Sequence, residues 1–553
     1  MKRKVVALTM AALMALSFGA CGDSKGGSEG GNAASVEIDE NSLDYQYGEG
    51  VTFHSDEPVT YSLLYSDHEN YPYKEDWRIW SAIEEKTNVK FDMNLVARTD
   101  YNDKMSTLIN TGDAPYIISK AYDETPYIDG GQIVAISDWV QYMPNYQKCV
   151  KEWGMEEDLK QIYQSNGKYY KLPGMWEKAA GGYSLVIRKD IFDAAGIDVT
   201  ELEKNWTWDD FVEALETVKE YTGADYVWSD QFQGDSALNI CAVQYGVTAG
   251  WGVSNGTAFD FDKNEFYFAD SSEDFKAFAA LWNKMYSEGL LDPESFSQDN
   301  EQAQAKFYRG DSYVMSVNYQ VLADMMSSDK MQVEGADLYM VVYPGGPKGH
   351  LQCETSRLEN GLMISKNALD ELGEEEFVKM LRFVDWLWYS DEGQTLVQWG
   401  VEGETYTKDA DGSIVLDSGI YYNGINPGAE KQLNVDFGFG GGVFSYGGSE
   451  ELRFSKFTEG ERDWNQRIYD NCTPRELAPP IMADEEQKEE MGLIQSPLID
   501  YVNTSLAQFI SGSMDVENDW EEYVSQCESK GSTEYIEMAN EIFQNTKDVL
   551  GME

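Results

Sequence analysis

Short apolar runs alternate with amphipathic segments along most of the chain. The run at 61–65 is typical of a buried strand, residues 76–87 place apolar side chains at helical spacing, and 89–96 alternates as a strand. Strand, helix and strand at this spacing predict a βαβ unit, whose ligands gather beyond the carboxyl ends of the strands. The polar loop from Asp67 to Tyr71 is therefore a candidate wall of a binding site, with an ordinary solvated loop as the alternative.

A second strand with a polar exit follows. Residues 101–110 have a helical pattern that stops at Gly112, with Pro115 just beyond. The apolar run 116–119 then predicts a buried strand, and its outgoing loop carries Tyr122 and Asp123. Polar and aromatic side chains thus again follow the end of a predicted strand.

The stretch 167–198 predicts a change of direction. A strand over 168–172 is expected to end at Pro173 and Gly174, because proline lacks the ladder donor and glycine accepts the turn. A loop with Trp176 and Glu177 follows, then a strand over 183–188 and a helix from Lys189. Trp176 suits a crossing between domains or a binding cleft, and equally well an ordinary core position.

The remaining pattern is mixed and becomes helical toward the end. Thr207 is placed to cap a helix, 271–290 is amphipathic, and the strand predicted over 312–317 leads into Asn318 and Tyr319. Strands are expected over 338–343 and 362–365, helices over 374–399 and much of 495–551, and a hairpin turn at 409–412.

Composition narrows the class of protein. A chain of 553 residues favours two domains, and 13% aromatic residues suggest aromatic contact surfaces as well as a core. A net charge of -56 argues against nucleic acid or anionic lipid as the main partner.

Motifs for chemistry are lacking in the sequence. Three histidines without paired spacing and cysteines without a CxxC favour neither a metal site nor a disulfide framework, so we expect no cofactor and assign no catalytic residue. Most cysteines after Cys21 are interpreted as small buried hydrophobes. The glycine-rich stretch 437–442 opens no helix, which favours a loop at the rim of a cleft over a phosphate site.

The N-terminus predicts export. A basic start, an apolar stretch and small residues before Cys21 resemble a bacterial lipoprotein signal over 1–20, with Cys21 lipidated; a plain secretory signal is the alternative. Residues 21–50 begin with glycine, serine and asparagine and are expected to form a flexible tether. The folded body would then be anchored to the outer surface of the cell membrane and would not span it.

Several motifs, in this order and spacing, together resemble the extracellular solute-binding proteins that deliver carbohydrates to ABC importers, in particular their larger lipoprotein branch. The matching stretches are Leu108 to Pro115, Gly167 to Pro173, Leu185 to Ile191, Trp206 to Phe211, Met285 to Glu294, Phe307 to Asp311, Tyr389 to Tyr406 and Phe509 to Gly512.

This resemblance implies an α/β fold, a two-lobe clamp of the type II periplasmic-binding-protein kind, with a hinge crossed several times and a helical C-terminal region. It assigns 51–172 and 360–405 to the N-terminal lobe, and 173–359 and 406–553 to the C-terminal lobe. It also implies ligand contacts from seven residues: Asp67, Tyr122, Asp123, Trp176, Glu177, Asn318 and Tyr319.

Aromatic rings beside carboxylates suit sugars, since a pyranose offers an apolar face and a ring of hydroxyls. We expect a monomeric, non-catalytic protein that binds an oligosaccharide and partners ABC permease subunits. A peptide or another solute, a secreted glycan-active enzyme, and a glycan-capture protein without a transporter are the alternatives.

Overall fold

The computed structural model describes residues 46–252, 255–327 and 330–552. The predicted signal 1–20, Cys21 and most of the predicted tether 21–50 lie outside these residues. No helix in the described ranges is long and apolar enough to cross a membrane.

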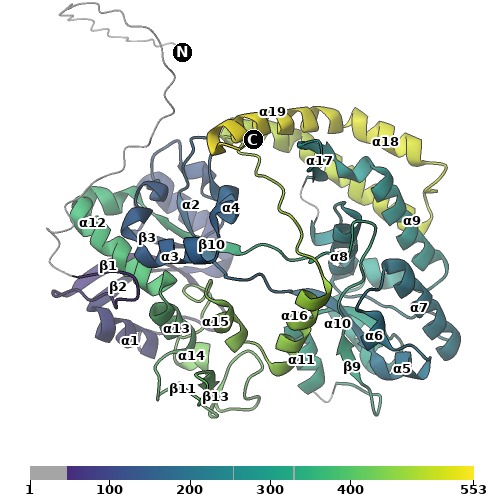
Figure 1. The fold of residues 1–553 in the computed structure, drawn as a ribbon, viewed down its shortest axis with the longest axis horizontal. Helices are drawn as coiled ribbons and strands as arrows, with labels where there is room; N and C mark the ends of the chain where they lie inside the picture. Colours follow the sequence, from purple (N-terminus) through teal and green to yellow (C-terminus); the bar gives the residue numbers. More distant parts are fainter. Residues whose placement is uncertain (1–45, 253–254, 328–329, 553) are drawn as a thin grey trace, which may run out of the picture. The chain divides into compact units, whose positions relative to one another are not determined.

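A five-stranded sheet, in the order β2-β1-β3-β10-β4, organises the first part of the chain (Figure 1). Strand β1 pairs in parallel with β2 and with β3, and helix α1 joins β1 to β2. The predicted βαβ unit is confirmed. The bounds are β1 (Val59–Asp67), α1 (Arg78–Thr87), β2 (Val89–Ala97), α2 (Tyr101–Thr111), β3 (Ile117–Ala121), α3 (Pro144–Glu152), α4 (Glu156–Leu159), β4 (Lys171–Met175) and β10 (Leu358–Ile364).

The break predicted at Pro173 and Gly174 is wrong, because both residues lie inside β4. Proline is tolerated there since β4 is the edge strand of the sheet, where a missing ladder donor costs little. Gly174 is needed for packing: a Cβ at this position would lie 2.5 Å from the Tyr446 ring. The chain leaves the first sheet after Met175.

A three-stranded antiparallel sheet, in the order β8-β5-β9, forms the centre of the second part. The predicted strand over 183–188 is confirmed as β5 (Tyr183–Arg188), and the predicted cap of α7 is confirmed by the reciprocal hydrogen bonds of Thr207 and Asp210. The other elements are α5 (Lys189–Ala194), α6 (Val199–Leu202), α7 (Trp208–Thr222), α8 (Asp235–Tyr245), β6 (Thr257–Asp260), β7 (Glu265–Phe268), α9 (Glu273–Ser287), α10 (Asn300–Arg309), β8 (Val314–Asn318), α11 (Tyr319–Ser327) and β9 (Leu338–Met340).

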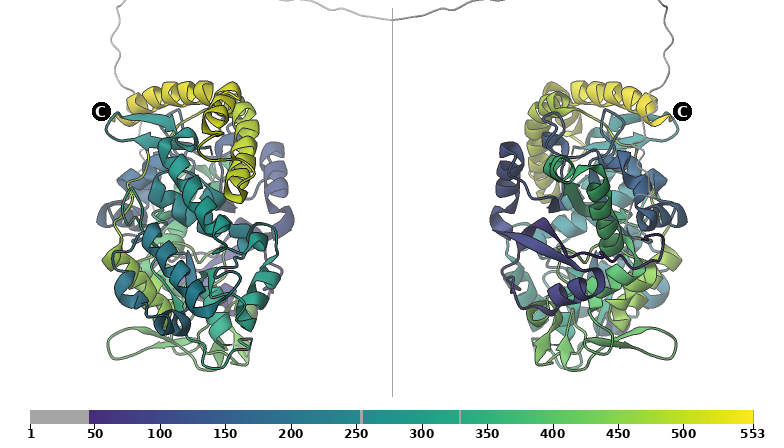
Figure 2. Two further views of the ribbon diagram at one scale, coloured as in Figure 1. Left: turned by 90° about the vertical axis from the view of Figure 1, so that its right-hand side faces the viewer. Right: turned by 90° about the vertical axis from the view of Figure 1, so that its left-hand side faces the viewer.

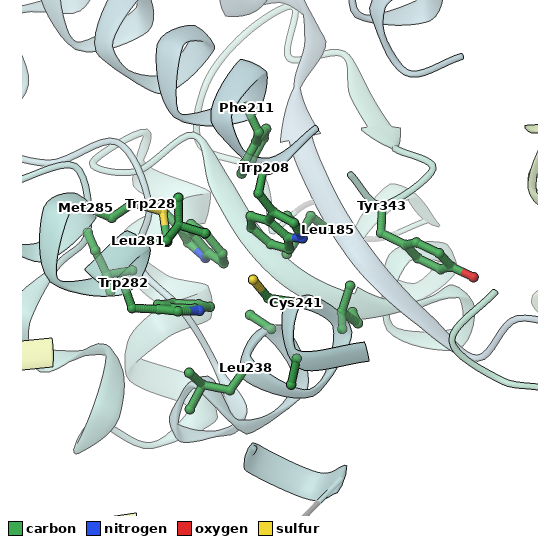
Figure 3. Packing of buried hydrophobic residues seen from close by; sticks show 14 of the residues in the cluster. Leu185, Trp208, Phe211, Trp228, Leu238, Cys241, Leu281, Trp282, Met285 and Tyr343 are labelled. Atoms are coloured by element: carbon green, nitrogen blue, oxygen red, sulfur yellow. The ribbon is translucent and has the colours of Figure 1, made fainter. Parts of the chain in front are cut away.

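Three tryptophans dominate the core around this sheet. Trp208, Trp228 and Trp282 are fully buried, and the ring centroids of Trp228 and Trp282 are 5.6 Å apart. The Cys241 thiol lies among the three indoles (Figure 3). All five cysteines after Cys21 are buried and unbridged, which confirms their interpretation as small hydrophobes. Removing one such indole costs about 3–5 kcal/mol.

The chain passes between the two sheets more than once. Residues 176–182 join β4 to β5, and 341–357 join β9 back to β10. Helix α16 (Glu459–Asn471) then returns to the second sheet, where Trp464 Nε1 donates to the Val341 carbonyl oxygen at 3.0 Å. The expected two-lobe α/β fold with a repeatedly crossed hinge is confirmed.

One segment assigned to the second lobe lies against elements of the first. Trp77 Nε1 donates to the Val435 carbonyl oxygen at 2.9 Å, and the ring centroids of Phe444 and Trp80 are 6.0 Å apart. We propose that residues 433–446 belong to the first lobe; the other lobe limits stay predictions. The elements of this part are α12 (Lys366–Tyr389), α13 (Asp391–Trp399), β11 (Tyr406–Lys408), β12 (Ile414–Leu416), β13 (Ile420–Tyr421), β14 (Lys431–Gln432), α14 (Leu433–Asp436), α15 (Glu450–Ser455) and α16 (Glu459–Asn471).

The helical C-terminal region is confirmed. It consists of α17 (Glu485–Ser511), α18 (Trp520–Ser529) and α19 (Ser532–Leu550), drawn in yellow-green to yellow in Figure 2. Helix α17 packs along α9, where Asn283 Nδ2 donates to the Phe509 carbonyl oxygen at 2.9 Å. These helices therefore extend the core of the second sheet.

Candidate functional site

A pocket of about 220 Å³, here called the first pocket, lies at the carboxyl ends of three strands. Because β1, β2 and β3 run parallel, the residues after them meet at one edge of the sheet. The walls come from the loop after β1, the start of the segment after β2, the end of β3 and the glycine-rich stretch 437–442. They include His68, Tyr71, Arg98, Lys120, Tyr122 and Gly442.

His68 supports one wall of the first pocket. Its ring stacks on Tyr71 with the centroids 4.2 Å apart, and its Nε2 lies 2.5 Å from Arg98 Nη1. Burial lowers the pKa of His68, and the neighbouring Arg98 also lowers it, although Glu69 opposes them. The imidazole is therefore neutral near pH 7 and can accept from the Arg98 guanidinium.

Lys120 has an unusual backbone conformation for a strand residue. Its φ is +54°, in the left-handed region that costs a non-glycine residue about 1–2 kcal/mol. Two steps along β10, from Gly361 to Met363, match three steps along β3, from Ile118 to Ala121. The extra residue is a β-bulge, a feature that redirects side chains next to binding sites.

An aromatic ring and a glycine lie next to the Lys120 ammonium. Its Nζ is 5.9 Å from the centre of the Tyr446 ring and would be 3.2 Å from a Cβ placed on Gly442. Burial lowers the pKa of Lys120, and so does Arg98, while Glu359 raises it. The glycine at 442 thus leaves room for the ammonium inside the pocket.

The loop after β3 places the two residues predicted there differently. Tyr122 is 62% exposed and lines the first pocket, and its carbonyl oxygen accepts from Lys171 Nζ at 2.8 Å. Asp123 points to other partners: its Oδ1 accepts from the Thr125 N–H at 3.1 Å and lies 3.9 Å from Lys488 Nζ. Asp123 is not among the residues that line the first pocket.

Trp176 is buried, with 6% of its surface exposed, and two cations face its ring. The Arg453 guanidinium carbon lies 4.5 Å and Lys456 Nζ 4.7 Å from the ring centre. Glu177 Oε2 accepts from the Glu450 N–H at 2.7 Å, at the start of α15. The crossing segment and α15 are thereby held together.

A second pocket, of about 260 Å³, lies where β5 begins and β8 ends. Asn318 pairs with Tyr183 across these strands, and both line the second pocket together with Tyr319, Lys456 and Glu461. Burial, reinforced by Arg453, lowers the pKa of Lys456 to about 7. Burial raises the pKa of Glu461 to about 7. This pocket therefore combines one cation and one acid whose charges both change near neutral pH.

Of the seven predicted contact residues, Tyr122 lines the first pocket and Asn318 and Tyr319 line the second. Asp67 lies between two residues of the first pocket, but its Oδ1 accepts from the Tyr73 N–H at 2.7 Å and shapes the loop. Trp176 and Glu177 lie on the crossing segment. The binding roles of all seven stay predictions.

Sequence reasoning singled out none of the pocket cations as site residues. Lys120 lies in the predicted loop after the strand 116–119, and Arg98 directly follows β2, so a position at a strand end was the available signal. Lys456 comes from a segment far away in the sequence and carries no local motif. Within the described ranges, no group of three histidine, cysteine or acidic side chains is placed to hold a metal ion.

Comparison with known proteins places this geometry in a family. Residues 72–395 match the model of the family described as bacterial extracellular solute-binding protein. The lipoprotein LipO of Bacillus subtilis (strain 168) is 24% identical over 341 residues, covering 59% of this chain and 63% of that protein. The match thus spans less than two thirds of the length of that relative.

Solved structures share the fold at low identity. The alginate-binding protein AlgQ2 without calcium ion has a TM-score of 0.63 and 17% identity, with 90% of this chain and 100% of that chain covered. An HMO-binding solute-binding protein of Bifidobacterium longum infantis gives 0.63 and 14% at the same coverage. The N-glycan transport protein NgtS of Streptococcus pneumoniae gives 0.55 and 14%, with 90% and 99% covered.

Proposed function

The chain belongs to the bacterial extracellular solute-binding proteins, and we propose that it captures an oligosaccharide between its two lobes and delivers it to the permease of an ABC importer. The observation that carries the proposal is a pocket with aromatic and hydrogen-bonding walls at the carboxyl ends of parallel strands, in a chain of this family.

The chemistry of both pockets supports a saccharide. Tyr71 and Tyr122 offer ring faces beside Asn102 in the first pocket, and Tyr183 and Tyr319 stand beside Asn318 in the second. Such walls suit a pyranose, with an apolar face and many hydroxyls. Proteins of the same fold are named for binding alginate and HMO and for transporting N-glycan.

We assign three kinds of role to the predicted contact residues. Tyr122 and Tyr319 stack on sugar rings. The Trp176 ring holds the neighbouring cations that contact the ligand. Four polar side chains either form hydrogen bonds with sugar hydroxyls directly or fix the loops that do so. They are Asp67, Asp123, Glu177 and Asn318.

The size of the pockets supports closure. Their volumes of about 220 and 260 Å³ are each below the about 300–1,000 Å³ of typical ligand sites. We propose that the first lobe contributes the first pocket, the second lobe the second, and that hinge bending brings them onto opposite ends of one ligand.

We also propose where the protein acts and that it does not cleave its ligand. A lipid on Cys21 holds the protein at the outer surface of the cell membrane, where it acts as a monomer and meets permease subunits. We propose that the ligand leaves unchanged, as expected of a transport protein of this family.

A thermal-shift screen of the purified protein against oligosaccharides of graded length tests this function. A true ligand at 100 times its dissociation constant stabilises the folded state by about 2.7 kcal/mol. The saccharide recovered afterwards is analysed by chromatography. We expect stabilisation without a new product; cleavage would support an enzyme, and stabilisation by peptides alone would contradict the saccharide assignment.

A further inference from the structure

The first pocket contains positive charge without a matching acid. Arg98 and Lys120 both line it, and no carboxylate among the described residues does so. The chain has 98 acidic and 42 basic residues, so a pocket of this kind runs against the overall composition. Sugar hydroxyls can accept from lysine and arginine, but an anionic group gains more from two neighbouring cations, because hydrogen bonds between charged partners are roughly twice as strong.

Three other buried or half-buried cations of this protein have acidic partners, whereas Lys456 of the second pocket, like Lys120, faces an aromatic ring instead. Salt bridges join Lys171 to Glu124 at 3.0 Å, Lys306 to Asp292 at 2.7 Å and Arg467 to Glu203 at 2.7 Å. The Lys120 ammonium, by contrast, forms no ion pair or hydrogen bond within the described part of the chain, although it is partly withdrawn from water; Glu359 acts on it only through its more distant charge. Desolvating an unpaired ammonium is unfavourable, and so is its left-handed backbone. The unpaired ammonium and the left-handed backbone both cost folding free energy at Lys120. We take this as a sign that the ammonium has a partner in a bound ligand.

Arg98 is placed to share that partner. One of its guanidinium N–H groups is directed to His68, which fixes the head at the rim of the pocket. The remaining N–H groups of an arginine form a planar fork that suits carboxylate and sulfate oxygens. The rings of Tyr71 and Tyr122 line the same pocket, where a sugar ring would pack.

We propose that the ligand is an acidic oligosaccharide, and that its carboxylate or sulfate group binds between Lys120 Nζ and the Arg98 guanidinium in the first pocket. This inference rests on the proposed function and specifies the class of saccharide. The lysine supplies a compact charge from the inner wall, and the arginine supplies directed donors from the rim.

Matched ligand pairs test the inference by calorimetry. One arm compares galacturonate oligosaccharides, and sialyl oligosaccharides, with their carboxyl-reduced forms; the other compares sulfated galactan oligosaccharides with their desulfated forms. We expect an acidic member to bind at least about tenfold more tightly than its neutral counterpart, the size of one hydrogen bond to a charged group. The arm that responds identifies the anionic group.

Variants assign the effect to the pocket. We expect Lys120→Gln and Arg98→Gln each to weaken binding of the acidic ligand about 10- to 100-fold, and to weaken binding of the neutral counterpart much less. Lys204→Gln, an exposed lysine with its own partner Glu201, removes the same charge elsewhere and should leave both affinities unchanged. The unfolding midpoint of each variant checks that the fold is retained.

The possible outcomes distinguish a failure of the acidic-ligand inference from a failure of the proposed saccharide-binding function. Equal binding of acidic and neutral partners, binding of neutral saccharides alone, or an unchanged acidic affinity in Lys120→Gln would overturn the inference and leave the saccharide transporter intact. Failure of every saccharide in both arms would count against the proposed function itself.

Discussion

Lys171 on β4 and Lys120 on β3 lie on the two strands that flank β10, in opposite surroundings. Lys171 is buried against Glu124 and also donates to the Tyr122 carbonyl oxygen, so it fixes the loop that follows β3. Lys120 projects from a bulge of β3 into a pocket without a carboxylate. One sheet therefore contains a lysine that stabilises the fold and a second lysine that we propose contacts the ligand.

Breaking the structural pair should have the largest effect. Glu124→Gln leaves Lys171 buried without an opposite charge, and we expect a loss of about 3–5 kcal/mol in the free energy of unfolding, measured with urea. Glu201→Gln, at the exposed pair with Lys204, should cost less than about 1 kcal/mol. Similar costs at the two positions would remove the contrast between buried and exposed pairs.

Two buried acids, Asp270 and Asp230, also lack a cationic partner among the described residues, and the effect of burial on them appears as a raised pKa. Burial raises the pKa of Asp270 to about 7 and that of Asp230 to about 6, although hydrogen bonds from Thr248 and Ser316 favour the charged forms. The folded state then holds protons that the unfolded state releases at pH values above about 4. Their contribution to stability is present at low pH and is lost as the pH rises toward 7.

For Asp270 this loss amounts to about 2 kcal/mol between pH 5 and pH 7.5. Asp270→Asn should therefore flatten the dependence of unfolding free energy on pH, and Asp230→Asn should do so to a smaller extent. Asp123→Asn, at an exposed position, serves as the control. An unchanged pH slope in Asp270→Asn would show that this carboxyl titrates normally.

Trp176 is a third arrangement, in which an aromatic ring rather than a carboxylate faces the cations. Trp176→Leu should weaken ligand binding by about 1 kcal/mol, because Arg453 and Lys456 lose a cation–π contact. Calorimetry with the saccharide that binds best provides the measurement. If affinity is retained while the variant stays folded, Trp176 has only a packing role.

The smallest change in stability is expected at Lys120. Burial and Arg98 disfavour its charged form and Glu359 favours it, so Lys120→Gln should leave the free energy of unfolding within about 0.5 kcal/mol of the parent. Urea titration side by side with Glu124→Gln gives the contrast directly. A loss comparable to that of Glu124→Gln would assign Lys120 to the fold.

Local sequence patterns predicted much of the fold. The βαβ unit around α1, the capped start of α7 and the helical end of the chain follow from period, caps and glycine stops. Pro173 and Gly174 misled because their effect depends on strand position: only the completed sheet shows that β4 is an edge strand. Edge position is a tertiary property without a local sequence signal.

The pockets were less accessible from the sequence. Tyr122 could be named because parallel strands bring their carboxyl ends together. Asn318, at the end of a strand in the antiparallel sheet, was named from the family resemblance. The bulge at Lys120 depends on register with β10, more than two hundred residues away, and Gly442 arrives from further still. Which cations line the pocket therefore depends on strand pairing and on contacts between residues far apart in the sequence.

Small-angle scattering tests most directly whether this family member works as a closing clamp. Curves are recorded for the protein alone and saturated with the saccharide that stabilises it most in the thermal screen. Closure of two lobes on the ligand predicts a smaller radius of gyration in the complex. Superimposable curves with and without that saturating ligand would contradict closure.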